Sequence, residues 1–151
     1  MTDRPPKALP RRADYRFAVP ITTRWADNDV YAHANNVVYY SWFDTVVARF
    51  LIQAGLVVPR QTDLVGVVVE TCCRYHRPLG FPDDVTAMLR VARIGTTSVR
   101  YEIGIFRNAE DTVSAEGHFV HVYVDAATQS RPQPLPPAFR AALQPMVVAA
   151  S

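Results

Sequence analysis

One segment of the chain, residues 37–54, constrains the fold more than any other. Its polar residues recur every three or four positions, the period of an α-helix, and the positions between them are mostly apolar or aromatic. These polar residues are Ser41, Asp44, Thr45, Arg49 and Gln53. They form only a narrow stripe, so we expect a helix that is buried on most sides and that ends at Gly55.

Strands are predicted on both sides of this helix. Before it, apolar residues alternate at Tyr15, Phe17, Val19 and Ile21, and Pro20 places this strand at a sheet edge or a bulge. After it come four β-like stretches, at residues 64–77, 84–94, 98–107 and 112–124. We therefore predict an α+β fold: an antiparallel five-stranded sheet, its last four strands in a meander, wrapped around one long central helix.

The length of the chain, 151 residues, predicts a single domain. We assign residues 1–14 to a disordered N-terminal arm, residues 15–145 to the domain and residues 146–151 to a C-terminal tail. Within the domain, a proline-rich linker at residues 129–137 precedes a short helix at residues 138–143. Because one helix cannot cover both faces of a five-stranded sheet, we expect a homodimer or a homotetramer.

Composition excludes several classes of function. A net charge of +2 with no run of basic residues argues against nucleic acid, and no apolar run is long enough to span a membrane. Cys72 and Cys73 are neighbours whose side chains would point to opposite faces of a strand, which excludes a disulfide framework and gives little support to a metal site. The chain shows no secretory signal, and a reducing cytoplasm fits it best. A single lysine, Lys7, among 16 basic residues is a bias common in GC-rich bacteria.

Two groups of motifs resemble the 4-hydroxybenzoyl-CoA thioesterase-like branch of the hotdog-fold acyl-CoA thioesterases. The first is Arg24-Trp25-Ala26-Asp27-Asn28-Asp29-Val30-Tyr31-Ala32-His33-Ala34-Asn35-Asn36, followed by Tyr39. The second comprises Tyr75-His76-Arg77-Pro78-Leu79, Asp83-Asp84-Val85, Arg93-Ile94-Gly95-Thr96-Thr97-Ser98 and Ala115-Glu116-Gly117. The resemblance covers residues 17–143 and implies a hotdog fold, in which sheets join edge to edge and sites form between subunits.

The same resemblance implies a catalytic role for Asp29, as general base or as nucleophile. Spacing alone would favour a loop aspartate in an Asx turn, with Asp27 as a structural partner of the loop. Many relatives have glycine where this chain has Ala32, which predicts either an ordinary backbone there or some strain.

The backbone amide of Asn36 matches the family's oxyanion donor, because amides in the first turn of a helix are unpaired and lie at its positive end. Capping by Asn35 or Asn36 is the alternative, and both roles are compatible. His33 is a second catalytic candidate, although a loop histidine that fixes the backbone is the more ordinary interpretation.

Substrate contacts are expected from two further groups. Tyr39 and Asp44 lie on the helix that touches the acyl group in related enzymes, although a core tyrosine and a solvated aspartate are equally ordinary. Arg74, Arg77, Arg90 and Arg93 are candidates for the phosphates of coenzyme A, with a surface charge as the alternative for each. We expect no metal and no cofactor, since coenzyme A enters as part of the substrate.

The sequence thus favours an acyl-CoA thioesterase that releases the free acid and coenzyme A. One alternative is a thioesterase acting on acyl-carrier protein in a biosynthetic pathway, with the same chemistry at Asp29. The other is a non-catalytic acyl-CoA-binding module, because a fold does not fix a function.

Overall fold

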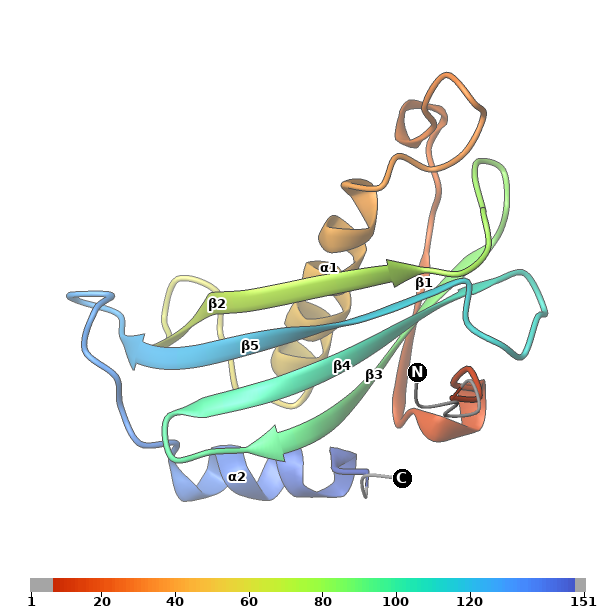
Figure 1. Ribbon diagram of the computed structural model, residues 1–151. Helices are drawn as coiled ribbons and strands as arrows, with labels where there is room; N and C mark the ends of the chain where they lie inside the picture. Colours follow the sequence, from red (N-terminus) through yellow and green to blue (C-terminus); the bar gives the residue numbers. More distant parts are fainter. Residues whose placement is uncertain (1–6, 149–151) are drawn as a thin grey trace, which may run out of the picture.

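The chain forms one antiparallel sheet with a helix across one face, in a computed structural model that describes residues 7–148. The strands are β1 (Phe17–Ile21), β2 (Leu64–Tyr75), β3 (Val85–Ile94), β4 (Ser98–Arg107) and β5 (Ala115–Asp125). The helices are α1 (Val38–Gln53) and α2 (Pro137–Leu143), with three short 3-10 turns at Arg12–Asp14, Trp25–Asp27 and Gln144–Met146. Figure 1 shows α1 crossing the sheet and α2 beside β3.

Helix α1 confirms the predicted helix to within one residue at each end. Its buried side chains recur at helical spacing: Tyr39, Trp42, Phe43, Val46, Val47, Phe50 and Leu51. Gly55 has a φ of 72°, and the amides of Gly55 and Leu56 donate to the carbonyls of Ile52 and Leu51, so the helix ends in a Schellman motif. With 16 residues, α1 is of ordinary length for a globular protein.

The burial of α1 is less complete than the narrow polar stripe predicts. Besides the polar residues, Ala48 and Ile52 are exposed. The sheet therefore covers one side of the helix, and an apolar strip beside the polar stripe stays open within the protomer. A helix patterned for burial on most sides is typical of one that packs against more than its own sheet.

The predicted meander is correct for three strands and wrong for β2. The strand order is β1-β3-β4-β5-β2, so β2 pairs with β5, from Leu64 opposite Asp125 to Tyr75 opposite Ala115, and does not pair with β3. The connection after β2 carries the buried Leu79, whose carbonyl accepts a hydrogen bond from the amide of Ala34. This connection is therefore attached to the loop before α1 and does not form a tight hairpin.

The two sheet edges differ. Strand β1 forms one edge, as Pro20 predicts. Pro20 lies opposite Thr86 of β3. Strand β2 forms the other, and Val67, Val68 and Val69 are exposed along it. A long apolar edge with unpaired backbone groups is a template for pairing with a further strand.

Both ends of the described chain pack on the sheet. The expected disorder of residues 1–14 is wrong for Arg11–Asp14, because the Arg12 guanidinium donates to the carbonyls of Glu110 and Asn108 at 2.9 and 2.8 Å. Residues 1–6 lie outside the described part. In the predicted tail, Met146 is buried and the amide of Val148 donates to Val91 of β3. Residues 149–151 lie outside the described part.

Candidate active site

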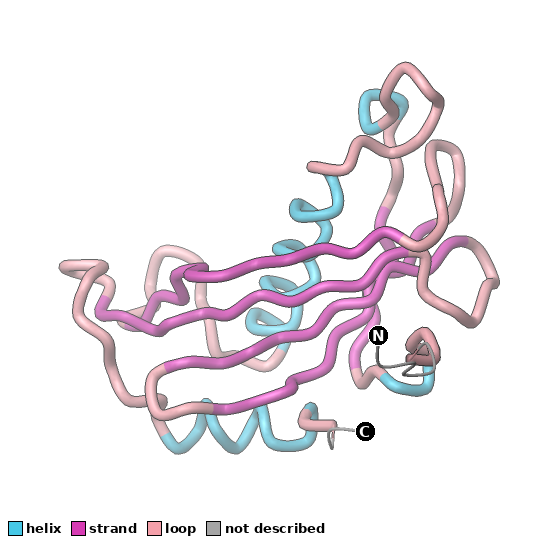
Figure 2. The backbone as a smooth tube through the Cα atoms, in the orientation of Figure 1, coloured by secondary structure: helices cyan, strands magenta, loops and turns pink. Residues whose placement is uncertain are grey.

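The loop at residues 22–37 stands beyond the end of the sheet, between β1 and α1 (Figure 2). Its anchor is Asp27, whose side chain is 1% exposed. The carboxylate accepts hydrogen bonds from the Arg24 amide at 2.7 Å and from the Arg24 guanidinium at 2.8 and 3.1 Å. The Asn35 amide donates to the Asp27 carbonyl at 2.8 Å. Asp27 is thus the structural partner of the loop that the sequence predicts.

Asp29 is half-buried in the same loop and forms the Asx turn that spacing predicts. Its Oδ1 accepts hydrogen bonds from the amides of Tyr31 at 2.8 Å and His33 at 3.3 Å. Its own amide donates to the His33 carbonyl at 2.7 Å. Oδ2 accepts no hydrogen bond from any residue between 7 and 148, so the turn fixes one carboxylate oxygen and leaves the other free to act.

A second loop holds this turn in place. The Asn28 Oδ1 accepts a hydrogen bond from the Phe81 amide at 2.9 Å. A Cβ at Gly80 would lie 2.7 Å from the Ala32 carbonyl oxygen, so this contact requires glycine. Ala32 has a φ of 60°, the left-handed conformation that glycine adopts freely. The sequence predicted either an ordinary backbone or some strain at Ala32, and the positive φ shows that the backbone is strained.

Asn36 lies just before α1. Its amide donates to no group within the described residues, and its carbonyl accepts a 2.7 Å hydrogen bond from the Tyr75 hydroxyl of β2. The N-cap of α1 is Val37 and no described side chain caps the helix, so the expected capping by Asn35 or Asn36 is wrong. Asn35 closes the preceding turn, with its Oδ1 3.3 Å from the Val37 amide and its carbonyl 2.9 Å from the Val38 amide. The Asn36 amide is therefore an open donor at the positive end of α1.

The remaining candidates near the loop differ in exposure. The His33 side chain is exposed and makes no hydrogen bond to the rest of residues 7–148, whereas its backbone closes the Asp29 turn. Tyr39 is 3% exposed and packs on Trp42 and Tyr75, with ring centroids 5.0 Å apart in both cases. Burial raises the pKa of Tyr39 to about 12. Tyr39 is therefore a core residue that packs against Tyr75, whose hydroxyl bonds to the Asn36 carbonyl.

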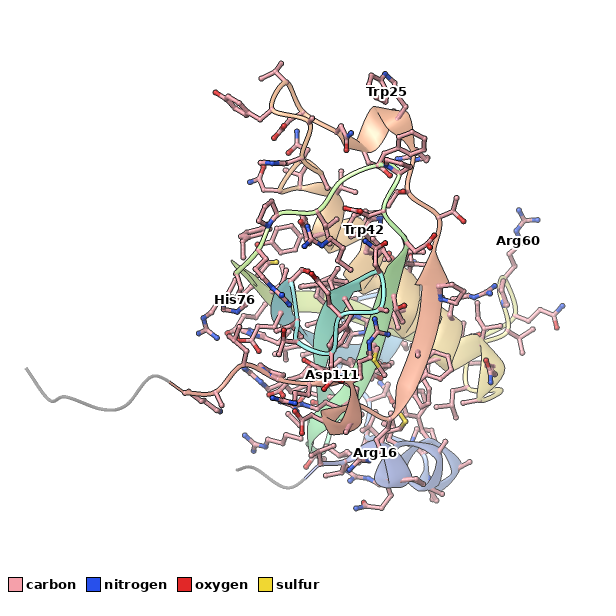
Figure 3. All side chains as sticks on the ribbon, turned by 90° about the vertical axis from the view of Figure 1, so that its right-hand side faces the viewer. Arg16, Trp25, Trp42, Arg60, His76 and Asp111 are labelled. Atoms are coloured by element: carbon pink, nitrogen blue, oxygen red, sulfur yellow. The ribbon has the colours of Figure 1, made fainter. Side chains whose placement is uncertain are left out.

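A cavity of about 480 Å³ lies at the other end of α1, where the helix meets β2 and β5. Val47, Ala48, Leu51, Val57, Leu64 and Gly66 form much of its wall. Asp44 and Arg60 line it as well, and both are exposed. Figure 3 shows Arg60 on the segment between α1 and β2. It also shows Trp25 at the tip of the loop at residues 22–37 and Trp42 within the fold.

His121 of β5 is the cavity residue that sequence reasoning missed. It is 5% exposed, and neither ring nitrogen has a hydrogen-bond partner in the described chain. Burial lowers the pKa of His121 to about 4, so the imidazole is neutral at physiological pH. The sequence contained a signal for this residue, because His121 alternates with Phe119 and Tyr123 and is therefore the polar member of a buried strand face.

The structure brings together only two of the four candidate arginines. Arg74 and Arg90 line a cavity of about 730 Å³ on the sheet face opposite α1, where Arg100, Glu102 and Glu116 also lie. Arg90 Nε is 2.7 Å from Glu102, and its guanidinium lies 5.0 Å from the centroid of the Tyr15 ring. Arg74 forms no ion pair with any described residue.

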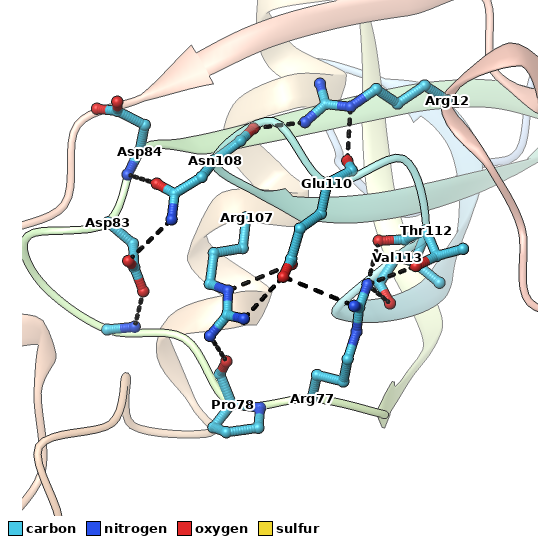
Figure 4. A network of polar contacts seen from close by, with 11 residues as sticks. Arg12, Arg77, Pro78, Asp83, Asp84, Arg107, Asn108, Glu110, Thr112 and Val113 are labelled. Carbon is cyan, nitrogen blue, oxygen red and sulfur yellow. Dashed lines mark hydrogen bonds and ion pairs between the residues drawn. The ribbon is translucent and has the colours of Figure 1, made fainter.

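Arg77 and Arg93 lie elsewhere. Arg77 belongs to the polar network in Figure 4, where it donates to Thr112 at 2.7 Å and lies 3.7 Å from Glu110. Arg93 is exposed on β3 at a register shift. Arg77 is thus occupied by internal contacts, and Arg93 is separate from the Arg74 and Arg90 cavity.

Within residues 7–148, no three His, Cys, Asp or Glu side chains are placed to hold a metal ion. In the same range, no helix is long and apolar enough to cross a membrane.

Comparison with known proteins places this geometry in context. The family model of the thioesterase-like superfamily matches residues 23–143. The PA5185 protein of Pseudomonas aeruginosa is 41% identical, with a TM-score of 0.90 over 95% of this chain and 100% of that one. A thioesterase-superfamily protein from Jannaschia is 26% identical, with a TM-score of 0.81 over 91% of this chain and 88% of that one.

A third structure carries a ligand. It is a thioesterase from Thermus thermophilus in complex with coenzyme A and zinc, 26% identical, with a TM-score of 0.73 over 88% of this chain and 95% of that one. No curated protein matches the chain significantly.

Proposed function

The chain belongs to the thioesterase-like superfamily, and from that premise we propose that it hydrolyses acyl-CoA thioesters with Asp29 and the Asn36 amide as its catalytic groups. One observation carries the proposal. The same loop presents a carboxylate oxygen without a hydrogen-bond partner and an open amide at the positive end of α1, among the described residues. A nucleophile or base and an oxyanion donor are the two elements that acyl transfer needs.

The reaction follows from these two groups. As a base, Asp29 takes a proton from water while the water oxygen attacks the thioester carbonyl; as a nucleophile, its Oδ2 attacks directly and water then releases the acid. In either case the carbonyl oxygen becomes an oxyanion, which the Asn36 amide stabilises. Collapse of the intermediate breaks the carbon–sulfur bond, and coenzyme A leaves as a thiolate that takes up a proton.

This chemistry needs no metal or organic cofactor, because a thioester is already an activated acyl donor. Coenzyme A enters as part of the substrate, as the ligand of the Thermus relative suggests. For its phosphates we propose Arg74 and Arg90, which share a cavity, ahead of Arg77 and Arg93. Arg77 bonds to Thr112 and Arg90 to Glu102, so each would exchange that contact for a phosphate, whereas Arg74 forms no ion pair with any described residue.

We further propose that the active unit is at least a homodimer, joined through the free edge of β2. Antiparallel pairing of β2 with a second copy about its middle sets the Gly66 end of one strand beside the Tyr75 end of the other. The Tyr75 hydroxyl holds the Asn36 carbonyl, so this pairing brings the catalytic loop of one copy to the His121 cavity of its partner. A fully active monomer in light scattering at micromolar concentration would contradict this arrangement.

The proposed activity is tested with a panel of acyl-CoA and acyl-carrier-protein thioesters, following the release of free thiol. We expect turnover of acyl-CoA by the wild type and its loss in Asp29→Asn. Faster turnover of the carrier-protein thioesters would favour the second candidate function. Binding of acyl-CoA without release of thiol by the wild type would contradict hydrolysis and favour a binding module.

A further inference from the structure

Asn36 lies in the turn that precedes α1, between two peptide units that are both held by hydrogen bonds. The unit that joins Asn35 to Asn36 is anchored at its carbonyl, which accepts a 2.9 Å bond from the Val38 amide. A peptide unit is planar and trans, so its amide points in the opposite direction from its carbonyl. The Asn36 amide, the proposed oxyanion donor, is therefore directed away from the bond that closes the turn.

The next peptide unit, between Asn36 and Val37, is held by a residue of the sheet. Its amide donates to Asn35 Oδ1 at 3.3 Å, a long hydrogen bond within the loop itself. Its carbonyl accepts a 2.7 Å hydrogen bond from the hydroxyl of Tyr75, which lies 39 positions later in the chain, at the end of β2. Of these two bonds, the one from Tyr75 is the shorter and comes from outside the loop.

The Tyr75 side chain is itself supported and protonated. Its ring packs edge-on against the buried ring of Tyr39, with centroids 5.0 Å apart and an interplanar angle of 89°. Burial raises the pKa of Tyr75, so the hydroxyl keeps the proton that it donates to Asn36. Burial also raises the pKa of the neighbouring Cys73 to about 11, so no thiolate competes for that proton at neutral pH. Tyr75 is thus a directional donor to the turn.

Loss of this bond would free the central peptide unit of the turn to rotate. Common turn types differ mainly in the orientation of that unit, so it can rotate while the flanking chain stays in place. Rotation would turn the Asn36 carbonyl oxygen toward the side where the Val37 amide now lies, one residue from the proposed donor. A partial negative charge at that point would disfavour a developing oxyanion.

We propose that Tyr75 is a positioning residue of the thioesterase reaction, whose hydroxyl holds the Asn36 carbonyl away from the oxyanion and so keeps the Asn36 amide effective as its donor. The inference rests on the proposed function, in which that amide stabilises the oxyanion. In this role Tyr75 acts through Asn36 and does not itself contact the reacting atoms. Tyr75 also ends the strand through which we propose that two copies join, so it connects that edge to the catalytic loop.

The kinetic test uses Tyr75→Phe, which removes the hydroxyl and keeps the ring on Tyr39. On the acyl-CoA that the wild type hydrolyses fastest, we expect kcat to fall by about tenfold with KM unchanged. The loss should be smaller than the roughly 10²-fold or more that follows removal of an oxyanion donor. Tyr40→Phe is the matched control, because the Tyr40 hydroxyl has no hydrogen-bond partner among residues 7–148 and the ring packs on Phe43.

Two analogues of that substrate separate positioning from a general loss of packing. In one, a CH₂ group replaces the thioester sulfur, and the resulting ketone stays trigonal. In the other, a CF₂ group replaces the sulfur, and the activated ketone adds water to become tetrahedral. Calorimetry should show that Tyr75→Phe weakens binding of the CF₂ analogue by about the factor lost in kcat and leaves binding of the CH₂ analogue unchanged. Equal losses for the two analogues would overturn the proposal.

Backbone hydrogen exchange, measured by NMR, tests the same bond without turnover. The amides of Val37 and Val38 should exchange about fivefold faster in Tyr75→Phe than in the wild type, the effect of losing one hydrogen bond, while those of β4 keep their rates. Equal exchange in the two proteins, or a kcat of Tyr75→Phe within about twofold of wild type, would overturn the proposal. If the wild type hydrolyses no thioester, the proposed function fails, and the exchange rates alone decide whether Tyr75 fixes this peptide unit.

Discussion

The two ends of α1 lie in surroundings that differ in exposure and in hydrogen bonding. At its N-terminus, Asp29 and Asn36 lie in a loop that is open to water and held by hydrogen bonds. At its C-terminal half, His121 lies in an apolar cavity with its polar atoms unsatisfied by the described residues. The proposed hydrolysis needs water and a free carboxylate, whereas an apolar acyl group would be buried in the cavity, so one helix supports two contrasting environments.

The distance between the two ends also matters. A helix of 16 residues is about 24 Å long, at a rise of about 1.5 Å per residue. An acyl group whose thioester lies at Asp29 would have to extend over much of that length to reach the cavity on the same α1. In the proposed pair of copies joined through β2, each copy would contribute a different end of its α1 to one site.

The largest effect is expected at the N-terminal end. Asp29→Asn keeps Oδ1 as acceptor for the amides of Tyr31 and His33, so the turn should survive while basicity and nucleophilicity are lost. We expect kcat to fall by about 10²-fold or more with little change in KM or in unfolding. His33→Ala is the control, because its exposed imidazole makes no contact that the turn requires. The opposite result, a loss only in His33→Ala, would replace Asp29 with a histidine-led mechanism.

The burial of His121 at the C-terminal half of α1 should make the free energy of unfolding depend on pH. Burial lowers the pKa of His121 from 6.5 to about 4 in the folded protein. Between these values the unfolded chain binds a proton that the folded chain does not, so the free energy of unfolding falls as the pH falls through this window. Near the lower end of this pH window, the free energy of unfolding has fallen by about 2 to 3 kcal/mol.

Urea unfolding of wild type and His121→Phe, at neutral pH and near the lower end of the window, measures this contribution. Acidification should destabilise the wild type more than the variant by that amount. Parallel losses in the two proteins would show that the imidazole is not held neutral by the fold.

Mixing variants tests whether the two ends work together across subunits. Asp29→Asn disables the loop, and Ala48→Trp fills the cavity from an exposed position of α1. Each homodimer should be nearly inactive. Co-expression under two tags should restore about a quarter of wild-type activity, because half of the random dimers are mixed and each has one intact site. Two differently tagged Asp29→Asn copies serve as control, and inactive mixed dimers would contradict a shared site.

The smallest effect concerns the backbone that shapes the N-terminal loop. Ala32 has a φ of 60°, and glycine adopts this conformation without the clash of a Cβ. Ala32→Gly should raise the free energy of unfolding by about 0.5 to 1 kcal/mol, after the entropy that glycine adds to the unfolded chain. Ala34→Gly is the matched control, since Ala34 is buried and lacks a positive φ, and it should destabilise. Equal losses in the two variants would show that Ala32 stores no strain.

Local patterns were sufficient for much of the fold. The three-to-four spacing of polar residues identified α1, Gly55 marked its end, and Pro20 marked an edge strand. The loop motif identified Asp29 and Asn36 as neighbours in one turn-rich segment before the helix. These features depend on residues close in sequence, so periodicity and turn chemistry report them directly.

Other features arose only from contacts between distant parts of the chain. The position of β2 beside β5 depends on long-range pairing, which the length of a connection does not determine. Arg77 and Arg90 resembled each other as surface charges, yet one bonds to Thr112 and the other to Glu102. The packing of Arg11–Asp14 depends on Arg12, which donates to carbonyls of the β4–β5 connection.

The sequence by itself determined the helix and the strands, because each follows from the spacing of neighbouring residues, and its resemblance to a family indicated the loop that we propose as catalytic. Only the tertiary structure decided that Asp29 keeps one oxygen free, that the apolar edge of β2 is open and that His121 lacks a partner among the described residues. The physical reason is that burial and hydrogen bonding are properties of an environment. A side chain acquires its environment from segments that are remote in sequence and meet only in the folded molecule.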